Sequence, residues 1–347
     1  MMYFSSSVLP RLINIYLGIF SWLVLIMVAG TSMASDLERP QDEKGSTRVH
    51  VAIFILDVDE VNNVSQTFDA NVYFELHWQD PRLANEGPNE NSRPLNDVWH
   101  PRIKFVNQQK LWPTFPEIVE IFPDGEVVYK QRVWGTFSQP LELKDFPFDQ
   151  QTFMIQLASV GYRPQEIELV NDSTSKTGIA SRFSLTDWDI LDWNLTFDSF
   201  IPSLDEQEIA GAKFSIKAQR RYGFFIIKVI LPLFLIVMMS WVVFWIDPKE
   251  SGTQINVAIT TMLTLIAYRF AVGTDLPKVS YLTRIDYFIL AATLLVFASL
   301  IEVVVTSTYA RVDKLNRARM IDRWARILFP TAFILMAFES LIFRFGL

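Results

Sequence analysis

The sequence contains no cysteine and only three histidines among its 347 residues. Without thiols, disulfide bonds, cysteine nucleophiles and thiolate metal sites are excluded. His50, His77 and His100 are scattered and show no metal-ligand spacing such as His-Glu-x-x-His, so the sequence predicts no metal site. It also shows no phosphate-binding glycine loop and no nucleophile–base pair. We therefore expect neither an enzyme nor a cofactor, and no nucleic-acid partner.

Hydrophobic residues make up 50% of the chain, and they concentrate in long runs. The first run lies within residues 8–29 and is followed by Ser32-Met33-Ala34, which is typical of a secretory cleavage site. We expect residues 1–34 to be a signal peptide, the alternative being a fifth membrane helix. Four later runs have the length of about 20 residues that a hydrocarbon core requires, and we expect helices at about 224–246, 253–272, 285–307 and 325–345.

Charge divides the mature chain into an exported domain, residues 35–221, and a membrane domain, residues 222–347. The exported part carries 30 acidic and 18 basic residues, a net charge near −12. Basic residues gather between the third and fourth runs, and the positive-inside rule places that link in the cytoplasm. They are Arg311, Lys314, Arg317, Arg319, Arg323 and Arg326. Four spans then leave both ends of the mature chain outside, which agrees with an exported domain.

Several segments of the exported domain are rich in β-branched and aromatic residues and are separated by turn formers such as Pro123-Asp124-Gly125. The segments are 49–58, 67–78, 125–137, 151–160 and 212–219. Strands at this spacing predict a β-sandwich. The expected fold class is therefore an extracellular β-sandwich followed by a four-helix transmembrane bundle.

The second membrane run is unusually polar, since TQINVAITTMLTLIAYRF (253–270) carries Gln, Asn, four threonines and an arginine. Helical periodicity places one stripe on a single face: Gly252, Asn256, Thr260, Leu263, Ala267, Phe270 and Thr274. A ring of copies would enclose a water-filled path with apolar constrictions at Leu263 and Phe270, because polar groups in spans usually face a cavity or the bundle interior. The alternative is that Thr and Asn hydrogen-bond to neighbouring helices.

Four segments of the exported domain are more specific than strand propensity: residues 57–78, WQDPRL (78–83), WHPRIKFVN (99–107) and FPFDQQTF (146–153). Arg220-Arg221-Tyr222 before the first span, Pro232 within it and DLPK (275–278) after the second span add to them. In this order, over residues 48–347, they resemble the pentameric ligand-gated ion channels, the family that includes the Cys-loop receptors. Gln139 and Phe153 occupy the positions of the loop cysteines, so the resemblance is to the bacterial branch.

This resemblance implies a homopentamer in the lipids of a bacterial inner membrane, with the N-terminal domain in the periplasm and the second span lining the pore. It implies a gating interface at the domain boundary, made by Asp59, Glu60, Phe146, Pro147, Phe148, Asp149, Arg220, Arg221 and Pro277. Within it, Asp149 and Arg220 match the family's core ion pair. The family often has an acid near Asn62 and Asn63, so here Asp59 or Glu60 would have to serve.

By the same resemblance, the agonist binds between subunits, where aromatic rings can hold a cation over their faces. The matching positions are Tyr73 and Glu75 on one side, and Val160, Tyr162, Phe200 and Asp205 on the other. Val160 stands where amine-binding members have Trp, which disfavours a simple quaternary amine. A proton, a divalent cation or another small molecule stays open as the modulator.

We expect monovalent cations to permeate, because the acidic exported domain attracts cations and Asp247 and Glu250 supply acids at the inner mouth. The alternative function is a membrane sensor that relays a periplasmic signal to a separate cytoplasmic partner without conducting ions. The expected cytoplasmic segments, residues 247–252 and 308–324, are too short for an output domain and favour the channel.

Overall fold

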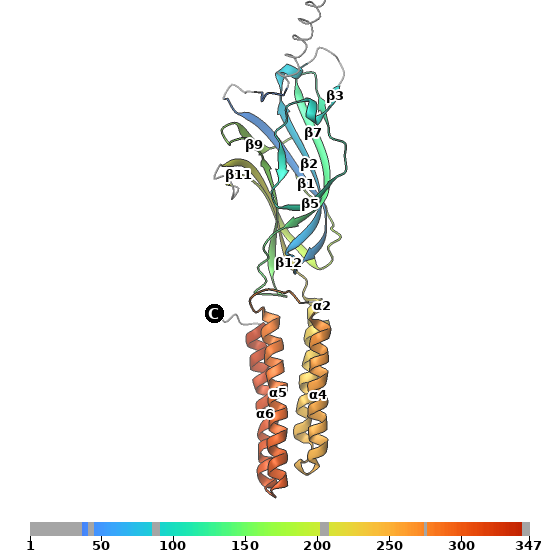
Figure 1. Cartoon of the computed structure of the whole chain (residues 1–347), viewed down its shortest axis with the longest axis vertical. Helices are drawn as coiled ribbons and strands as arrows, with labels where there is room; N and C mark the ends of the chain where they lie inside the picture. Colours follow the sequence, from blue (N-terminus) through green and yellow to red (C-terminus); the bar gives the residue numbers. More distant parts are fainter. Residues whose placement is uncertain (1–36, 41–44, 85–90, 202–207, 274–275, 342–347) are drawn as a thin grey trace, which may run out of the picture.

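The computed structural model describes residues 37–40, 45–84, 91–201, 208–273 and 276–341. It has a two-sheet β domain at one end and four long apolar helices at the other (Figure 1), which confirms the predicted fold class. The predicted signal peptide, Asp205 and Thr274 lie outside the described residues.

The β domain contains a sheet of eight strands and a sheet of four. The larger sheet runs β10-β1-β2-β7-β6-β3, with β9 paired to β1 and β5 paired to β7. Its strands are β1 (Thr47–Asn62), β2 (Thr67–Gln79), β3 (Asn91–Pro94), β5 (Gln108–Pro113), β6 (Ile118–Ile121), β7 (Glu126–Ser138), β9 (Ile167–Asn171) and β10 (Gly178–Ile179). The smaller sheet runs β11-β12-β8-β4, with β4 (Ile103–Phe105), β8 (Gln150–Ser159), β11 (Trp188–Phe200) and β12 (Ile209–Arg220). Two 3₁₀ turns, η1 (Pro81–Leu83) and η2 (Leu95–Asp97), flank β3.

Apolar and polar residues alternate along β2, and the burial of its side chains alternates with them. Because successive side chains of a strand point to opposite faces, one face of β2 turns inward with Phe68, Val72 and Trp78 buried. The other face, which carries Glu75 and His77, is half-buried. The strand therefore supplies the core with one face and leaves polar groups available on the other.

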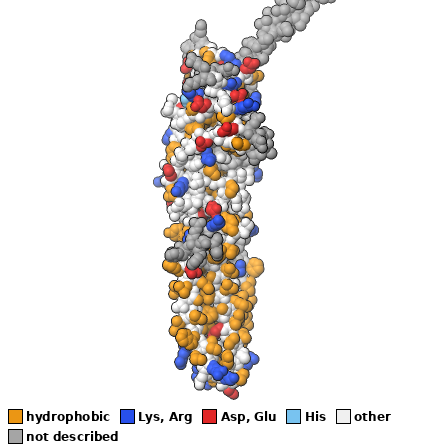
Figure 2. Space-filling view, turned by 90° about the vertical axis from the view of Figure 1, so that its left-hand side faces the viewer, with side chains coloured by type: hydrophobic (Ala, Val, Ile, Leu, Met, Phe, Trp, Pro, Cys, Tyr) orange, Lys and Arg blue, Asp and Glu red, His pale blue; other side chains and the backbone are white. Residues whose placement is uncertain are grey.

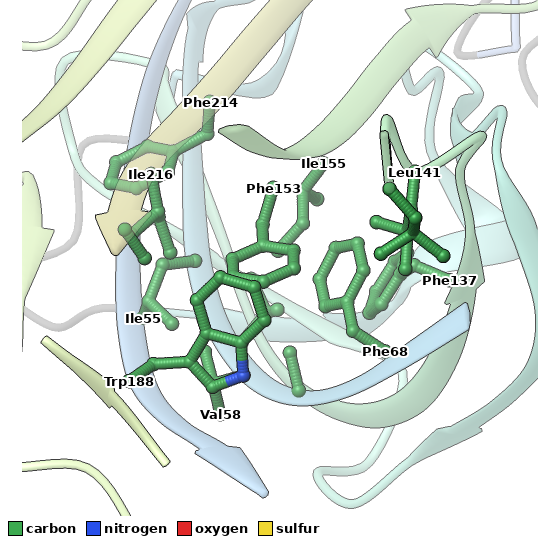
Figure 3. Close-up of a cluster of buried hydrophobic side chains, with 14 of the residues drawn as sticks. Ile55, Val58, Phe68, Phe137, Leu141, Phe153, Ile155, Trp188, Phe214 and Ile216 are labelled. Atoms are coloured by element: carbon green, nitrogen blue, oxygen red, sulfur yellow. The ribbon is translucent and has the colours of Figure 1, made fainter. Parts of the chain in front are cut away.

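The core lies between the two sheets, where aromatic side chains from both meet (Figure 3). Phe68 of β2 packs against Phe153 of β8 with ring centroids 5.2 Å apart, and Phe153 packs edge-on to Trp188 of β11. All three are nearly inaccessible to solvent. Burying a side chain of this size contributes about 1.5–3 kcal/mol, so the sandwich holds together without disulfides.

Four helical segments are long and apolar enough to cross a membrane: Gly223–Trp245, Pro248–Val272, Arg284–Arg311 and Leu315–Leu341. The first combines α2 (Gly223–Phe225), a π-helical turn η3 (Ile226–Ile230), α3 (Leu231–Val242) and η4 (Val243–Trp245). The second combines η5 (Pro248–Glu250) with α4 (Ser251–Val272), and the last two are α5 (Arg284–Arg311) and α6 (Leu315–Leu341). Hydrophobic side chains cover most of this half of the molecule (Figure 2).

Local sequence sets two of the helix starts. Thr283 opens α5 with a capping box, in which its hydroxyl and the Asp286 carboxylate bond each other's backbone N–H groups. In the first span, the π-helical turn ends just before Pro232. A proline ring clashes with the carbonyl four residues earlier, and a wider turn relieves that clash.

The fourth span begins earlier than the predicted residue 325, because α6 starts at Leu315. The link from α5 is thus confined to residues 312–314 instead of 308–324. Arg317, Arg319 and Arg323 lie on the first turns of α6. These charges lower the mean hydropathy of the first turns, so the predicted span did not include them. Arginine is nevertheless a good helix former.

Candidate functional site

Residues 146–149, here called the FPFD loop, lie between the β domain and the first span. Phe146 is fully buried and its ring packs edge-on against Phe225 of α2, with centroids 4.7 Å apart. Phe148 packs against Tyr222, with centroids 5.0 Å apart. Pro147 is buried as well. The loop therefore packs its apolar side chains against the start of the first span.

Tyr281 and the first two residues of α5 form hydrogen bonds to the FPFD loop and the residues just before it. The Leu143 N–H donates to the Tyr281 hydroxyl at 2.9 Å, and the Ile285 N–H donates to the Phe146 carbonyl at 3.3 Å. The Arg284 guanidinium donates to Asp145 at 2.9 Å and to the carbonyl of Leu341 at 3.2 Å. Asp145 and Arg284 were not among the predicted interface residues. Pro277 lies half-buried in the connection from α4 to α5.

The structure brings Asp149 and Arg220 together in a buried ion pair. Arg220 Nε lies 2.7 Å from one carboxylate oxygen of Asp149, and a terminal nitrogen lies 3.1 Å from the other. The side chains are 4% and 1% exposed. This fork-to-fork geometry is the strong form of an Arg–carboxylate contact, and it joins the end of β12 to the FPFD loop.

The rest of the Arg220 guanidinium is enclosed by neutral groups. It donates to the Asn63 side-chain oxygen at 2.9 Å. It also lies 4.8 Å from the ring centre of Phe146 and 4.2 Å from that of Trp188. The sequence analysis expected Asp59 or Glu60 to supply a nearby acid, whereas the side chain that bonds to Arg220 besides Asp149 is the amide of Asn63.

Asp59, Glu60 and Arg221 lie around the buried pair, on the surface. Asp59 accepts a hydrogen bond from the Trp134 indole at 2.9 Å, and Arg221 forms an exposed ion pair with Asp189. All three line a cavity of about 290 Å³ at the domain boundary, together with Asn63 and Phe224. The predicted interface residues of β1 and β12 thus meet at one site.

The faces of α4 differ sharply in exposure. The face that packs within the chain carries Gln254, Ala258, Thr261, Leu265 and Val272, all buried. The predicted stripe lies outside this buried face, since all of its described residues are exposed. They are Gly252, Asn256, Thr260, Leu263, Ala267 and Phe270. Leu263 is 61% exposed and Phe270 is 80% exposed. A single chain therefore leaves uncovered the whole described part of the stripe.

The polar side chains of α4 have two different roles. Gln254 is fully buried and donates to the carbonyls of Val243 and Ile246, which joins α4 to the end of the first span. Thr260 and Thr264 instead donate to carbonyls four residues earlier in their own helix. Among the described residues, these two threonines donate within their own helix, whereas the alternative explanation for the polarity was bonding to neighbouring helices.

The inner-mouth acids differ from each other. Asp247 caps η5 and forms an ion pair with Arg319 of α6 at 2.9 Å. The hydrogen bond from the Lys249 N–H, helped by Arg319, holds the pKa of Asp247 below its usual range against the effect of desolvation. Glu250 is exposed at the start of α4 and makes no capping bond. Glu250 is thus the freer of the two carboxylates.

The candidate agonist residues lie on two separate parts of the β domain. Tyr73 and Glu75 are neighbours on β2, where the tyrosine hydroxyl donates to the carboxylate. Val160 is exposed after β8, and Phe200 ends β11. Tyr162 accepts a hydrogen bond from Trp99 at 2.8 Å, and Arg102 lies over its ring at 5.4 Å. One ring face of this tyrosine is therefore already taken by a cation of the chain itself.

Comparison with known proteins agrees with this arrangement. Residues 33–222 match the family model of the neurotransmitter-gated ion-channel ligand binding domain, and residues 229–315 match that of the neurotransmitter-gated ion-channel transmembrane region. Over 291 residues, the chain is also 28% identical to a proton-gated ion channel of Gloeobacter violaceus. The aligned region covers 83% of this chain and 80% of the relative. With both regions present in order, around a buried Asp149–Arg220 junction, the chain belongs to the family of neurotransmitter-gated, or pentameric ligand-gated, ion channels.

Proposed function

We propose that the chain forms a homopentameric, cation-selective channel in which α4 lines the pore and ligand binding between β domains opens it. The observation that carries this proposal is the division of α4 into a face buried within the chain and an exposed stripe. Polar residues in membrane spans rarely face lipid. Asn256 and Thr260 therefore favour a water-filled axis, around which Leu263 and Phe270 form the apolar rings.

The proposed location is a bacterial inner membrane, with the β domain on the periplasmic side. Membrane lipids would cover the outer helices, and monovalent cations would pass along α4. The modulator is proposed to be a proton, a divalent cation or another small molecule that acts near Tyr73, Glu75 and Tyr162. The Arg102 guanidinium over Tyr162 speaks against a quaternary amine at that ring, because like charges repel.

The sensor alternative gains no support from the described links on the side away from the β domain. Ile246 and Asp247 alone separate η4 from η5, and residues 312–314 separate α5 from α6. Neither link has room for an output domain. The conducting function is therefore the one that the arrangement supports.

Single cysteines placed along α4 test the pore assignment, and the absence of native cysteine gives a clean background. We expect a water-soluble thiol reagent to block current at residues 256, 260, 263 and 267, because that stripe would be wetted in the open channel. Ala258 and Leu265, buried in the same helix, are the matched control positions. Strong block at the control positions, or none on the stripe, would rule out this orientation of α4.

Reversal potentials in asymmetric NaCl test charge selectivity. We expect reversal near the sodium equilibrium potential, because the exported domain carries a net charge near −12 and attracts cations within a Debye length of about 8–10 Å. Glu250→Gln should weaken the preference more than Asp247→Asn, since Asp247 is already paired with Arg319. Reversal near the chloride equilibrium potential would show that this field does not set selectivity.

A further inference from the structure

Three polar side chains converge on the half-buried face of β2. The proposed channel function gives them no role as a group. Glu75 and His77 are two residues apart on the strand and so point to the same side. Asp172 follows β9, and its N–H donates to the Val51 carbonyl of β1 at 3.1 Å, which directs the chain toward this face. One ligand atom from each residue lies within 4.8 Å of the others.

The spacing of these atoms suits a small tetrahedral cation. His77 Nε2 lies 3.4 Å from Glu75 Oε2 and 3.5 Å from Asp172 Oδ2. Ligands bound to zinc at about 2.0–2.2 Å stand about 3.3–3.5 Å apart at tetrahedral angles. Two of the three ligand-atom separations therefore match a tetrahedral zinc site, and the third is within 4.8 Å.

The second nitrogen of His77 is held in the way that metal-binding histidines usually are. Nδ1 lies 3.1 Å from Glu126 Oε1 of β7. Because a carboxylate only accepts, Nδ1 carries the proton in this contact. In the neutral ring the lone pair of Nε2 then faces Glu75, Asp172 and the Ser175 hydroxyl, whose oxygen lies 3.3 Å away. A carboxylate behind the imidazole fixes the tautomer and makes the ligand nitrogen more basic.

Asp172 supplies an independent indication that something binds here. The residue is 4% exposed, and its Oδ1 accepts hydrogen bonds from the N–H and hydroxyl of Thr174 at 2.8 and 2.6 Å. Its Oδ2, directed at His77, has no hydrogen-bond partner among the described residues. A buried carboxylate oxygen that accepts no hydrogen bond is costly.

We infer that Glu75, His77 and Asp172 form a binding site for a divalent transition-metal ion of the zinc class. The mixed set of one imidazole and two carboxylates favours zinc over calcium or magnesium, which prefer oxygen ligands only. A cavity of about 290 Å³ that is lined by His77 and Glu126 adjoins the cluster. Since Glu75 also accepts from Tyr73, a bound ion would fix two of the proposed agonist residues.

Equilibrium dialysis of the detergent-solubilised full chain against micromolar ZnCl₂, followed by elemental analysis, tests the inference. We expect one saturable zinc per subunit at neutral pH, with affinity lowered at least about tenfold by His77→Gln, by Asp172→Asn and by loss of the supporting carboxylate in Glu126→Gln. His100→Gln is the matched control, because this histidine lies outside the cluster. The measurement counts bound zinc and not current, so its outcome is independent of the proposed channel function.

Two results would overturn the site. One is a wild-type chain that binds no more zinc than His77→Gln. The other is equal loss in His77→Gln and His100→Gln. Asp172→Asn keeps the shape of the side chain and guards against misfolding of the histidine variant. The absence of cysteine removes thiols as competing zinc ligands.

Discussion

Arg220→Gln is expected to uncouple the β domain from the helices. The substitution leaves the Asp149 carboxylate, 1% exposed, without its cation. Breaking a buried ion pair on one side costs about 3–5 kcal/mol, and here that cost falls on the contact between the FPFD loop and β12. The expected results are a lower yield of assembled channel, a lower unfolding temperature and loss of ligand-evoked current.

A double-mutant cycle isolates the ion pair from other effects. Asp149→Asn with Arg220→Gln should lose clearly less stability than the two single changes added together. Arg221→Gln is the matched control, because the neighbouring arginine pairs with Asp189 at the surface, where screening leaves little net effect. If the two single effects simply add, the pair does not couple the domains.

Leu263→Thr is expected to open the channel more easily. In the proposed pore, Leu263 side chains form a ring that expels water when closed and must be hydrated when open. Leaving an apolar side chain of this size exposed costs about 1.5–3 kcal/mol, and threonine removes most of that cost. We expect activation at agonist concentrations at least about tenfold lower, equivalent to roughly 1.4 kcal/mol, or current without agonist.

Concentration–response curves in voltage-clamped cells provide the measurement. Met262→Thr is the control, since Met262 is half-buried and packs against the core of its own chain. That substitution should reduce stability or expression without easing opening. An unchanged curve for Leu263→Thr would place the constriction at another level of α4.

Strands with one buried face were predictable from the sequence, whereas the edge strand β11 was not. β2 and β7 alternate along their lengths, so their pattern is visible. In β11, Trp188–Phe200, most side chains are exposed, and the register with β12 shifts between Ile190 and Asp192. The sequence of an exposed edge strand does not need to alternate between apolar and polar residues. A β-bulge also interrupts any alternation that remains.

The coupling site was predictable as a set of segments but not in its detailed bonds. The Asp149–Arg220 pair was expected and is present. The third partner was expected to be an acid, yet the amide of Asn63 fills that position. Which of several adjacent polar residues points inward depends on the bulges of β1, at Ile55–Asp57 and Val58–Glu60. A one-residue shift of this kind reverses the facing of side chains and leaves no clear trace in composition.

The cluster around His77 could not be predicted from the spacing of residues along the sequence. We predicted no metal site because thiols and a His-Glu-x-x-His spacing are absent. The sequence Glu75-Leu76-His77 does place two ligand types on one face of a strand. The third, Asp172, is nearly a hundred residues away and reaches the others only through the parallel pairing of β9 with β1. Such long-range pairing cannot be read from local spacing.

Arg284 has a further consequence for the relation between the channel and its bilayer. Its guanidinium donates to Asp145 beside the FPFD loop and also to the carbonyl of Leu341, at the end of the apolar helix α6. A helix that tilts to match a thicker or thinner membrane moves that carbonyl, and the movement acts on the loop through one side chain. Because coupling between two sites is reciprocal, a ligand that displaces the loop must likewise alter which bilayer thickness α6 fits best.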